Sequence, residues 1–342
     1  MLTPSHRLAL YMEGAFAEKT GKLGLGVLRY SPHTTVCLID SMSVGQDLSK
    51  LTGISRPCPI VSSVQEAKEL GADVLVLGTA PPGGLVPSDW WPALDNAVQM
   101  GLSLVNGLHD HIAPRYPDLK AGQFIWDVRK EPVNLGVGTG AARLLANRRV
   151  LMVGTDMSVG KMTAGLEIHR DALASGRSSS FVATGQTGII ISGDGVPLDA
   201  VRLDYATGAI EAEVCKHKDS ELIVVEGQGS LIHPGSSATL PLMRGSCPTH
   251  LVLCHRAGME TLPRVPWVRV PNLNDVIQLY EGLASACGTF PEAKVVGIAL
   301  NTLGLTAGEA EAALVRVGQT TGLPVCDPVR GHARLLLEAV LA

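Results

Sequence analysis

A strand that runs into a glycine-rich turn and then into a helix constrains this sequence more than any other feature. The apolar run at residues 150–153 precedes the segment GTDMSVGKMT, and residues 161–174 have the composition of a helix. Backbone N–H groups of such a turn point inward, and the amino terminus of the helix adds partial positive charge. The sequence therefore predicts a phosphate-binding loop within an α/β domain.

The loop departs in two ways from the usual phosphate-loop (P-loop) pattern, Gly-x4-Gly-Lys-[Ser/Thr]. Five residues separate Gly154 from Gly160, and the hydroxyl residue comes one position late, at Thr163. That hydroxyl usually binds Mg²⁺, so either Thr163 binds the metal from the next helical position or the site uses metal differently or not at all. The residues expected to hold the phosphate are Gly154, Thr155, Asp156, Ser158, Val159, Gly160, Lys161, Met162 and Thr163.

Short apolar runs alternate with helical patterns along the chain, which is typical of a mostly parallel sheet covered on both faces. The expected strands are residues 7–12, 34–40, 59–62, 73–78 and 103–106 in the first half, and 150–153, 180–184, 222–225, 251–254, 295–300 and 323–326 in the second. The expected helices are residues 64–70, 91–100, 161–174, 274–287, 306–321 and 332–341, with another opening within residues 13–26. We expect an α/β protein with a Rossmann-like domain at residues 1–145 and a P-loop NTPase-like domain at residues 146–342.

Composition and charge restrict the possible partners. The formal net charge is −4 and no basic stripe occurs, which argues against nucleic acid. No apolar run reaches the roughly 20 residues that span a bilayer, and the start of the chain lacks a signal-peptide pattern. The seven cysteines show no metal-ligand or redox spacing, as in a reducing compartment. We expect a cytoplasmic protein that acts on a small molecule, and a homo-oligomer is a reasonable expectation.

An acidic residue closes the apolar strand of the segment LIVVEGQGSLIHP. Glu226 ends that strand, and the carboxyl ends of neighbouring parallel strands are where open α/β sheets bind ligands. Glu226 could act as a general base or hold Mg²⁺. We take Glu226, His233 and Lys161 as candidate catalytic residues, Gln228, Gly229 and Ser230 as candidate substrate-binding residues, and His255 as a weaker candidate; a structural role is the alternative for each histidine.

Two further segments offer polar groups after strands. The segment TGQTG and two aspartates beyond it give the candidate substrate-binding residues Thr184, Gly185, Gln186, Thr187, Gly188, Asp199 and Asp204. In the first half, the loop at residues 107–111 contains His109, Asp110 and His111, for which we favour a polar loop facing a cleft over a metal site. Arg29, Tyr30 and Arg129 are weaker candidates.

Parts of the chain resemble two known enzyme families. Residues 59–108 resemble the nucleotide-binding fold of succinyl-CoA synthetases, which implies a Rossmann-like domain and suggests coenzyme A. The loop and the segment VEGQG resemble the GTDxxVGKT and VEGxGG motifs of dethiobiotin synthetases. Those enzymes carry a lysine where Thr184 and Gly185 stand, which argues against their ATP-driven ring closure here. Related phosphate-loop enzymes contact the nucleotide base through an asparagine that corresponds to Asn301.

The motifs GTDMSVGKMT, ATGQTGIIISGDGVPLDAVRLDYATGAIE, VEGQGSLIHP, GIALNT, GLHD and DVRK together resemble a bacterial family long catalogued as a domain of unknown function. Members are described as D-glutamate N-acetyltransferases, so the resemblance implies acetyl transfer from acetyl-CoA to the amine of an acidic amino acid. Glu226 or His233 would then be the base, and backbone N–H groups at 185–188 or 227–229 would stabilise the oxyanion. The alternatives are an ATP/Mg²⁺-dependent ligase or kinase of the dethiobiotin synthetase type and a nucleotide-binding regulator without turnover.

Overall fold

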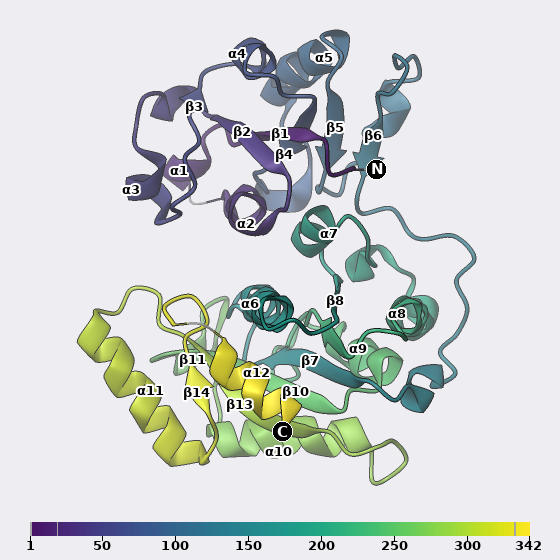
Figure 1. The fold of residues 1–342 in the computed structure, drawn as a ribbon, viewed down its shortest axis with the longest axis vertical. Coiled ribbons are helices and arrows are strands. Elements are labelled where there is room, and N and C mark those ends of the chain that lie inside the picture. Colours follow the sequence, from purple (N-terminus) through teal and green to yellow (C-terminus); the bar gives the residue numbers. More distant parts are fainter. Residues whose placement is uncertain (1, 19, 332) are drawn as a thin grey trace. The chain divides into compact units, whose positions relative to one another are not determined.

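The chain forms two compact units in the computed structural model, which describes residues 2–18, 20–331 and 333–342 (Figure 1). Unit 1 comprises Met1–Glu131 and Gln186–Ala200, and unit 2 comprises Pro132–Gly185 and Val201–Ala342. A segment from the second half of the chain thus belongs to the compact unit of the first half. The domain junction near residue 145 came from composition alone and stays a prediction.

Unit 1 is built on a parallel sheet with the strand order β3-β2-β1-β4-β5-β6. Its strands are β1 (Arg7–Tyr11), β2 (Thr34–Ile39), β3 (Ile60–Val61), β4 (Val74–Leu77), β5 (Ser103–Asn106) and β6 (Ile125–Asp127). The helices are α1 (Ala15–Glu18), α2 (Lys22–Tyr30), α3 (Leu48–Thr52), α4 (Val64–Glu69), α5 (Trp91–Gln99) and, from the later segment, α7 (Gln186–Ser192). The central strands β4 and β5 are buried throughout, as continuous apolar runs in a doubly covered parallel sheet should be.

Unit 2 contains a second parallel sheet, with the order β14-β13-β10-β7-β9-β8. Its strands are β7 (Arg148–Gly154), β8 (Ser179–Val182), β9 (Leu222–Val225), β10 (His250–Arg256), β13 (Lys294–Asn301) and β14 (Val325–Cys326), and β11 (Thr261–Leu262) pairs with β12 (Val265–Arg269) in a separate antiparallel ribbon. The helices are α6 (Lys161–Ala174), α8 (Leu203–Lys216), α9 (Thr239–Ser246), α10 (Leu273–Ser285), α11 (Ala307–Thr321) and α12 (Arg334–Leu341).

Helices cover both faces of the second sheet. α6 and α12 pack on each other and on one face, and α10 lies on the opposite face (Figure 1). A Cβ added at Gly165 of α6 would lie 3.2 Å from Cγ of Met152 in β7 and 3.3 Å from Cγ1 of Val224 in β9, which is tighter than an ordinary contact. The absence of a side chain at this position therefore lets α6 lie close against the sheet.

The fold class predicted from the sequence is confirmed, since both sheets are parallel and both are wrapped by helices. The sequence interpretation missed α8 and α9, the β11–β12 ribbon and β6. The last helix begins at Arg334, and residue 332 of the predicted helix 332–341 lies outside the described residues. The strand predicted at 323–326 is reduced to Val325–Cys326, because Pro324 cannot donate to a ladder.

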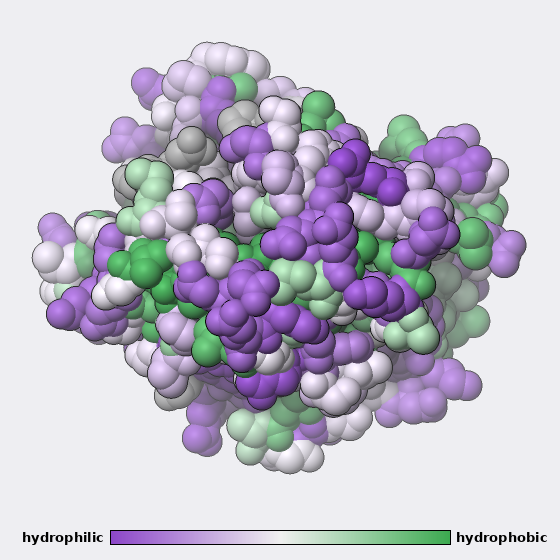
Figure 2. Space-filling view, turned by 90° about the horizontal axis from the view of Figure 1, so that it is seen from above, coloured by the Kyte–Doolittle hydropathy of each residue, from purple (hydrophilic) through white to green (hydrophobic). Residues whose placement is uncertain are grey.

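The surface offers no simple guide to assembly. Large exposed hydrophobic side chains are scattered, for example Met42, Leu85, Trp267 and Leu303. On the face that Figure 2 shows, hydrophobic residues are interspersed among hydrophilic ones. Among the described residues, no helix is both long and apolar enough to cross a membrane. A homo-oligomer therefore stays a prediction.

One buried carboxylate ties the segment that precedes β7 to α8. Glu211 accepts hydrogen bonds from the N–H of Thr139 at 3.0 Å, from its hydroxyl at 2.8 Å and from the N–H of Ala141 at 2.8 Å. Burial raises the pKa of Glu211, but these hydrogen bonds outweigh it and leave the pKa below its usual value. The ionised form is therefore the one that the folded chain binds.

Replacing Glu211 with Gln should lower the free energy of unfolding at neutral pH by about 1.5–3 kcal/mol, the usual value of hydrogen bonds to a charged group. Because the folded-state pKa lies below the unfolded one, this stabilisation is present above the unfolded pKa and is lost as the pH falls through the folded pKa. Urea unfolding of both proteins across this acidic range measures the difference. Glu311→Gln, at an exposed position of α11, is the control, and equal stability of E211Q and wild type at neutral pH would contradict the role.

Candidate functional site

The phosphate loop leaves the carboxyl end of β7 and enters α6 through two left-handed residues. Ser158 has φ 59° and Gly160 has φ 112°. A side chain at residue 160 would be strained in that conformation, so the turn requires glycine there. No side chain caps the start of α6. The N–H groups of its first turn, which have no partner within a helix, are therefore available to an anion.

β10 holds Thr155, the second residue of the loop. The N–H of Thr155 donates to the carbonyl of Cys254 at 3.1 Å, and the Thr155 hydroxyl lies 2.9 Å from Nδ1 of His255. Both Thr155 and His255 are buried. Burial lowers the pKa of His255 to about 4, so the ring is neutral at physiological pH. The weaker candidate His255 thus contacts the loop directly.

Two more side chains fix the loop from other elements. Asn301, at the end of β13, donates from Nδ2 to the carbonyl of Val159 at 3.3 Å and accepts from the N–H of Leu303 at 2.9 Å. Tyr280 of α10 donates to the carbonyl of Gly154 at 2.7 Å. Asn301 therefore positions the loop, and its contact with a nucleotide base stays a prediction.

Lys161 is buried beneath the loop and reaches back across it. Its Nζ donates to the carbonyl of Asp156 at 2.8 Å. Burial lowers the pKa of Lys161, and Cys254, Asp156 and Glu226 act in the opposite direction. A Cβ at Gly227 would lie 1.6 Å from the carbonyl oxygen of Met152 and 2.9 Å from Cδ of Lys161, so only glycine lets the backbone after β9 pass here.

Glu226 follows β9 and is enclosed by the end of β8. Its Oε2 accepts from the N–H groups of Thr184 at 2.8 Å and Gly185 at 3.1 Å, and the side-chain amide of Gln228 lies 3.4 Å from Oε1. The carboxyl is 4% exposed. Burial raises the pKa of Glu226 to about 7, although these hydrogen bonds and the charge of Lys161 oppose the rise. Near neutral pH the group can therefore both accept and release a proton.

His233 lies in the loop between β9 and α9. Its Nδ1 accepts from the N–H of Gly235 at 3.0 Å, so the neutral ring carries its proton on Nε2. Nε2 is buried without a hydrogen-bond partner in the described part of the chain, and it lies 4.0 Å from Oδ1 of Asp156. A buried donor without a partner beside an anion-binding loop is a natural contact for a ligand oxygen.

The neighbours of Glu226 shape the same loop. The Thr239 hydroxyl donates to the carbonyl of Gln228 at 3.0 Å, and the Ser236 hydroxyl accepts from the N–H of Ser230 at 2.9 Å. Gly229 has φ 69°, and a Cβ there would collide with Ser236. These predicted substrate-binding residues therefore form a rigid turn beside Glu226.

The other predicted substrate-binding residues are divided between the two units, and their role stays a prediction. Thr184 and Gly185 bind Glu226, whereas Gln186, Thr187 and Gly188 open α7 and belong to unit 1. Asp204 is exposed in the first turn of α8, where an acidic side chain complements the helix dipole. The half-buried Met162 and Thr163 lie in the first turn of α6.

In unit 1, Asp199 forms an ion pair with Arg129 at the end of β6. Arg129 also donates to the carbonyl of Gly107 at 2.8 Å and lies 2.9 Å from Nε2 of His109. The carboxylate of Asp110 accepts from the N–H of Val86 at 2.7 Å. These contacts hold the loop at 107–111, and no group of three or more potential metal-ligating side chains occurs within the described residues.

Sequence reasoning did not single out Tyr280. It is fully buried, and besides its bond to Gly154 it accepts from the N–H of Leu231 at 3.1 Å. It thereby connects the phosphate loop with the turn that carries His233. The sequence pattern of α10 predicts that Tyr280 is a buried aromatic residue. The hydrogen bonds of its hydroxyl can be recognised only in the folded structure.

Comparison with known families supports this architecture. Residues 41–131 match a family described as a domain of unknown function, DUF1611_N, Rossmann-like domain, and residues 136–337 match the DUF1611_C P-loop domain. A crystal structure of a DUF1611 family protein from Anabaena variabilis is 51% identical, with a TM-score of 0.94, and the alignment covers 98% of this chain and 99% of that one.

Two curated relatives carry an enzyme name. A protein from Tritonibacter scottomollicae named D-glutamate N-acetyltransferase is 37% identical over 339 residues, which cover 97% of this chain and 98% of the relative. A protein of the same name from a Pseudoalteromonas species is 35% identical over 274 residues, which cover 78% of this chain and 81% of the relative.

Replacing Lys161 with Met should weaken the binding of inorganic pyrophosphate by about 10- to 100-fold, which corresponds to one hydrogen bond to a charged group. Met preserves the volume of the buried stem and removes only the charge and the donors. Calorimetric titration of both proteins measures the change. Lys294→Met, at an exposed position of β13, is the matched control, and an unchanged affinity of K161M would show that Lys161 does not hold the phosphate.

Proposed function

The chain belongs to the DUF1611 family, and we propose that it is an N-acetyltransferase that moves an acetyl group from acetyl-CoA to the amine of an acidic amino acid, with D-glutamate as the first candidate. The observation that carries the proposal is Glu226, a buried carboxyl with its pKa raised to about 7, beside the phosphate loop. The names of the two curated relatives support the reaction and the substrate.

The phosphate loop fits the donor. Coenzyme A carries a pyrophosphate and a 3′-phosphate, and a loop with free helix N–H groups and Lys161 can hold such groups without hydrolysing them. Acetyl-CoA, when bound, supplies the activated acyl group. The chain supplies the position of the phosphates and the groups that handle protons and charge.

Glu226 is the proposed base. An amine must be neutral to attack an acyl carbon, and a base must take its proton as the new bond forms. A carboxylate with a pKa near 7 is ionised in a large fraction of molecules at physiological pH and still binds a proton well. The backbone N–H groups of Thr184 and Gly185 keep Oε2 fixed, and Oε1, which lies near the side-chain amide of Gln228, is the proposed proton acceptor.

His233 is proposed as a hydrogen-bond donor rather than a base. Its Nδ1 is occupied by the N–H of Gly235, and its Nε2 carries the proton. Nε2–H and Lys161 could therefore stabilise negative charge on a phosphate or on the acyl oxygen. The N–H of Gly185 donates to Glu226, which favours the turn at residues 227–229 over residue 185 as the source of backbone donors.

An ATP/Mg²⁺-dependent ligase or kinase remains the second candidate, because a phosphate loop fits it equally well. For such a reaction, Thr163 and Glu226 would be the metal ligands. Both N–H donors on Oε2 favour a proton-transfer role for Glu226 instead. A nucleotide-binding regulator without turnover is the third candidate, and it makes no use of a carboxyl with a raised pKa.

Incubation with acetyl-CoA and D-glutamate should release the free thiol of coenzyme A, and Glu226→Gln should lower kcat by about 10²- to 10⁴-fold, the usual contribution of a general base. The wild-type rate should rise with pH through about 7, because Glu226 must lose its proton, and E226Q should lack this inflection. Glu221→Gln, at an exposed position before β9, is the control. Full turnover of E226Q would exclude Glu226 as the base. Mg²⁺-dependent ATP consumption without thiol release would contradict the proposed acetyl transfer.

Replacing His233 with Phe should lower kcat/KM by about 10- to 100-fold, as expected for one lost hydrogen bond to a charged acceptor. The inflection near pH 7 should stay, since it belongs to Glu226. The measurement is the pH–rate profile of H233F, and His217→Phe, at the end of α8, is the control. Loss of the inflection in H233F would instead assign the base to His233.

A further inference from the structure

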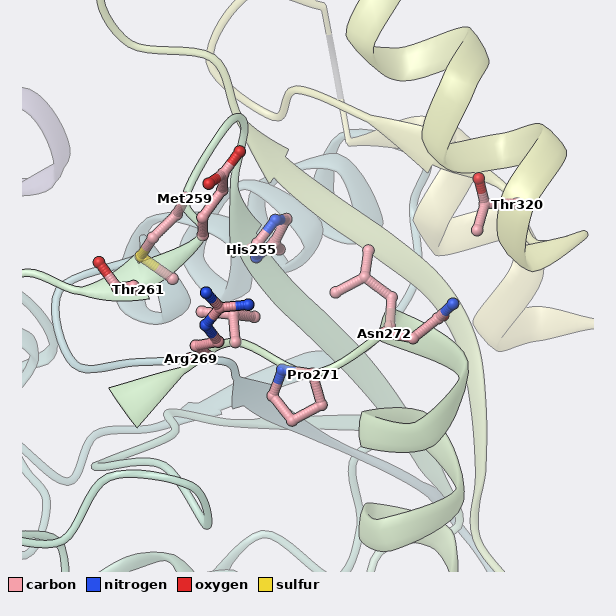
Figure 3. Close-up of a pocket in the computed structure, with 10 residues that line it drawn as sticks. His255, Met259, Thr261, Arg269, Pro271, Asn272 and Thr320 are labelled. Carbon is pink, nitrogen blue, oxygen red and sulfur yellow. The ribbon is translucent and has the colours of Figure 1, made fainter. Parts of the chain in front are cut away.

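A cavity in unit 2 lies at the end of β10, which borders β7 on the side opposite to β9 and Glu226. It has a volume of about 490 Å³ and lies between the end of β10, the β11–β12 ribbon and the start of α10 (Figure 3). Its lining includes His255, Met259, Glu260, Arg269, Val270 and Asn272. A volume of this size is within the range of cavities that hold small ligands.

The cavity and the phosphate loop share a wall. His255 lines the cavity, and its Nδ1 lies 2.9 Å from the hydroxyl of Thr155, the second residue of the loop. The lining of the cavity is therefore in hydrogen-bond contact with the phosphate loop. A ligand with its phosphates on the loop has an adjoining space for the group attached to them.

The chemistry of the lining selects among possible groups. Arg269 and Glu260 contribute one charge of each sign, and burial keeps the His255 ring neutral. Met259 and Val270 add apolar surface. The lining combines apolar residues with hydrogen-bonding ones, and a neutral, flat ring with hydrogen-bonding edges matches such a mixture. The apolar residues are Met259, Val270, Pro271 and Leu273, and the polar ones are His255, Glu260, Thr261, Arg269, Asn272 and Thr320.

We propose that this cavity binds the adenosine part of an adenine nucleotide whose phosphates lie on the loop. The next step rests on the proposed function: the nucleotide is the coenzyme A part of acetyl-CoA. The acyl end of acetyl-CoA then extends toward Glu226, on the opposite side of β7. In this arrangement acetyl-CoA binds to unit 2, with its adenosine end in the cavity and its acyl end toward Glu226. ATP carries the same adenosine group, so the experiment must separate the two sources.

The test uses Val270→Trp, which fills the cavity from the end of β12, and Val315→Trp, at an exposed position of α11, as the matched control. The probes are adenosine 3′,5′-bisphosphate, acetyl-CoA, ATP with Mg²⁺, and S-acetylpantetheine, which lacks the nucleotide. In V270W the Kd of adenosine 3′,5′-bisphosphate and of acetyl-CoA should rise at least ~10-fold, as expected when the better part of a buried ring contact is lost. The rate with S-acetylpantetheine should not change.

The outcomes separate this inference from the proposed function. An unchanged affinity for adenosine 3′,5′-bisphosphate in V270W, an equal loss with S-acetylpantetheine, or no nucleotide binding by the native protein would overturn the cavity assignment. If the protein transfers no acetyl group but V270W loses ATP binding, the adenosine site stands and the proposed reaction falls. Met259→Trp fills the same cavity from the other side and replaces V270W if that variant does not fold.

Discussion

The position of β7 in the second sheet is the constraint on which the site depends. β7 lies between β10 and β9, and all of these strands run in parallel, so their carboxyl ends meet at one edge. The phosphate loop starts from the middle of that edge. Its first residues contact His255 from β10, and Lys161 passes toward Glu226 from β9. A different strand order would leave the loop with only one of these partners.

Burial has opposite consequences for the ionisable groups at this edge. It raises the pKa of Glu226 toward neutrality, and it lowers the pKa of Lys161 and of His255. Each shift disfavours the charged form of its group. An anionic ligand would reverse part of this balance, because it stabilises protonated Lys161. The protonation of Glu226 and the occupancy of the loop are therefore linked through Lys161.

The sequence was sufficient for the loop, the acid at the end of β9 and the α/β class, because each of these follows from local pattern and from the rule that ligands bind at the carboxyl ends of parallel strands. The sequence could not predict which ring nitrogen of His233 carries the proton. The tautomer depends on the N–H of Gly235, two residues away in a turn that no pattern predicts. The sequence could not predict the role of Tyr280 either, because its hydroxyl contacts Gly154 and Leu231, which are far away in the sequence. Gln186 and Asp199 lie in a segment that packs within unit 1, and their role as substrate-binding residues stays a prediction.

That segment also affects the order in which the chain can fold. Unit 1 needs Gln186–Ala200 for α7, which packs on α2, and for Asp199, which binds Arg129. A ribosome must therefore synthesise the phosphate loop, β8 and residue 200 before unit 1 has all of its chain. The two units are consecutive in most of the sequence, yet neither can be cut free at a single peptide bond, and their maturation during synthesis is interleaved.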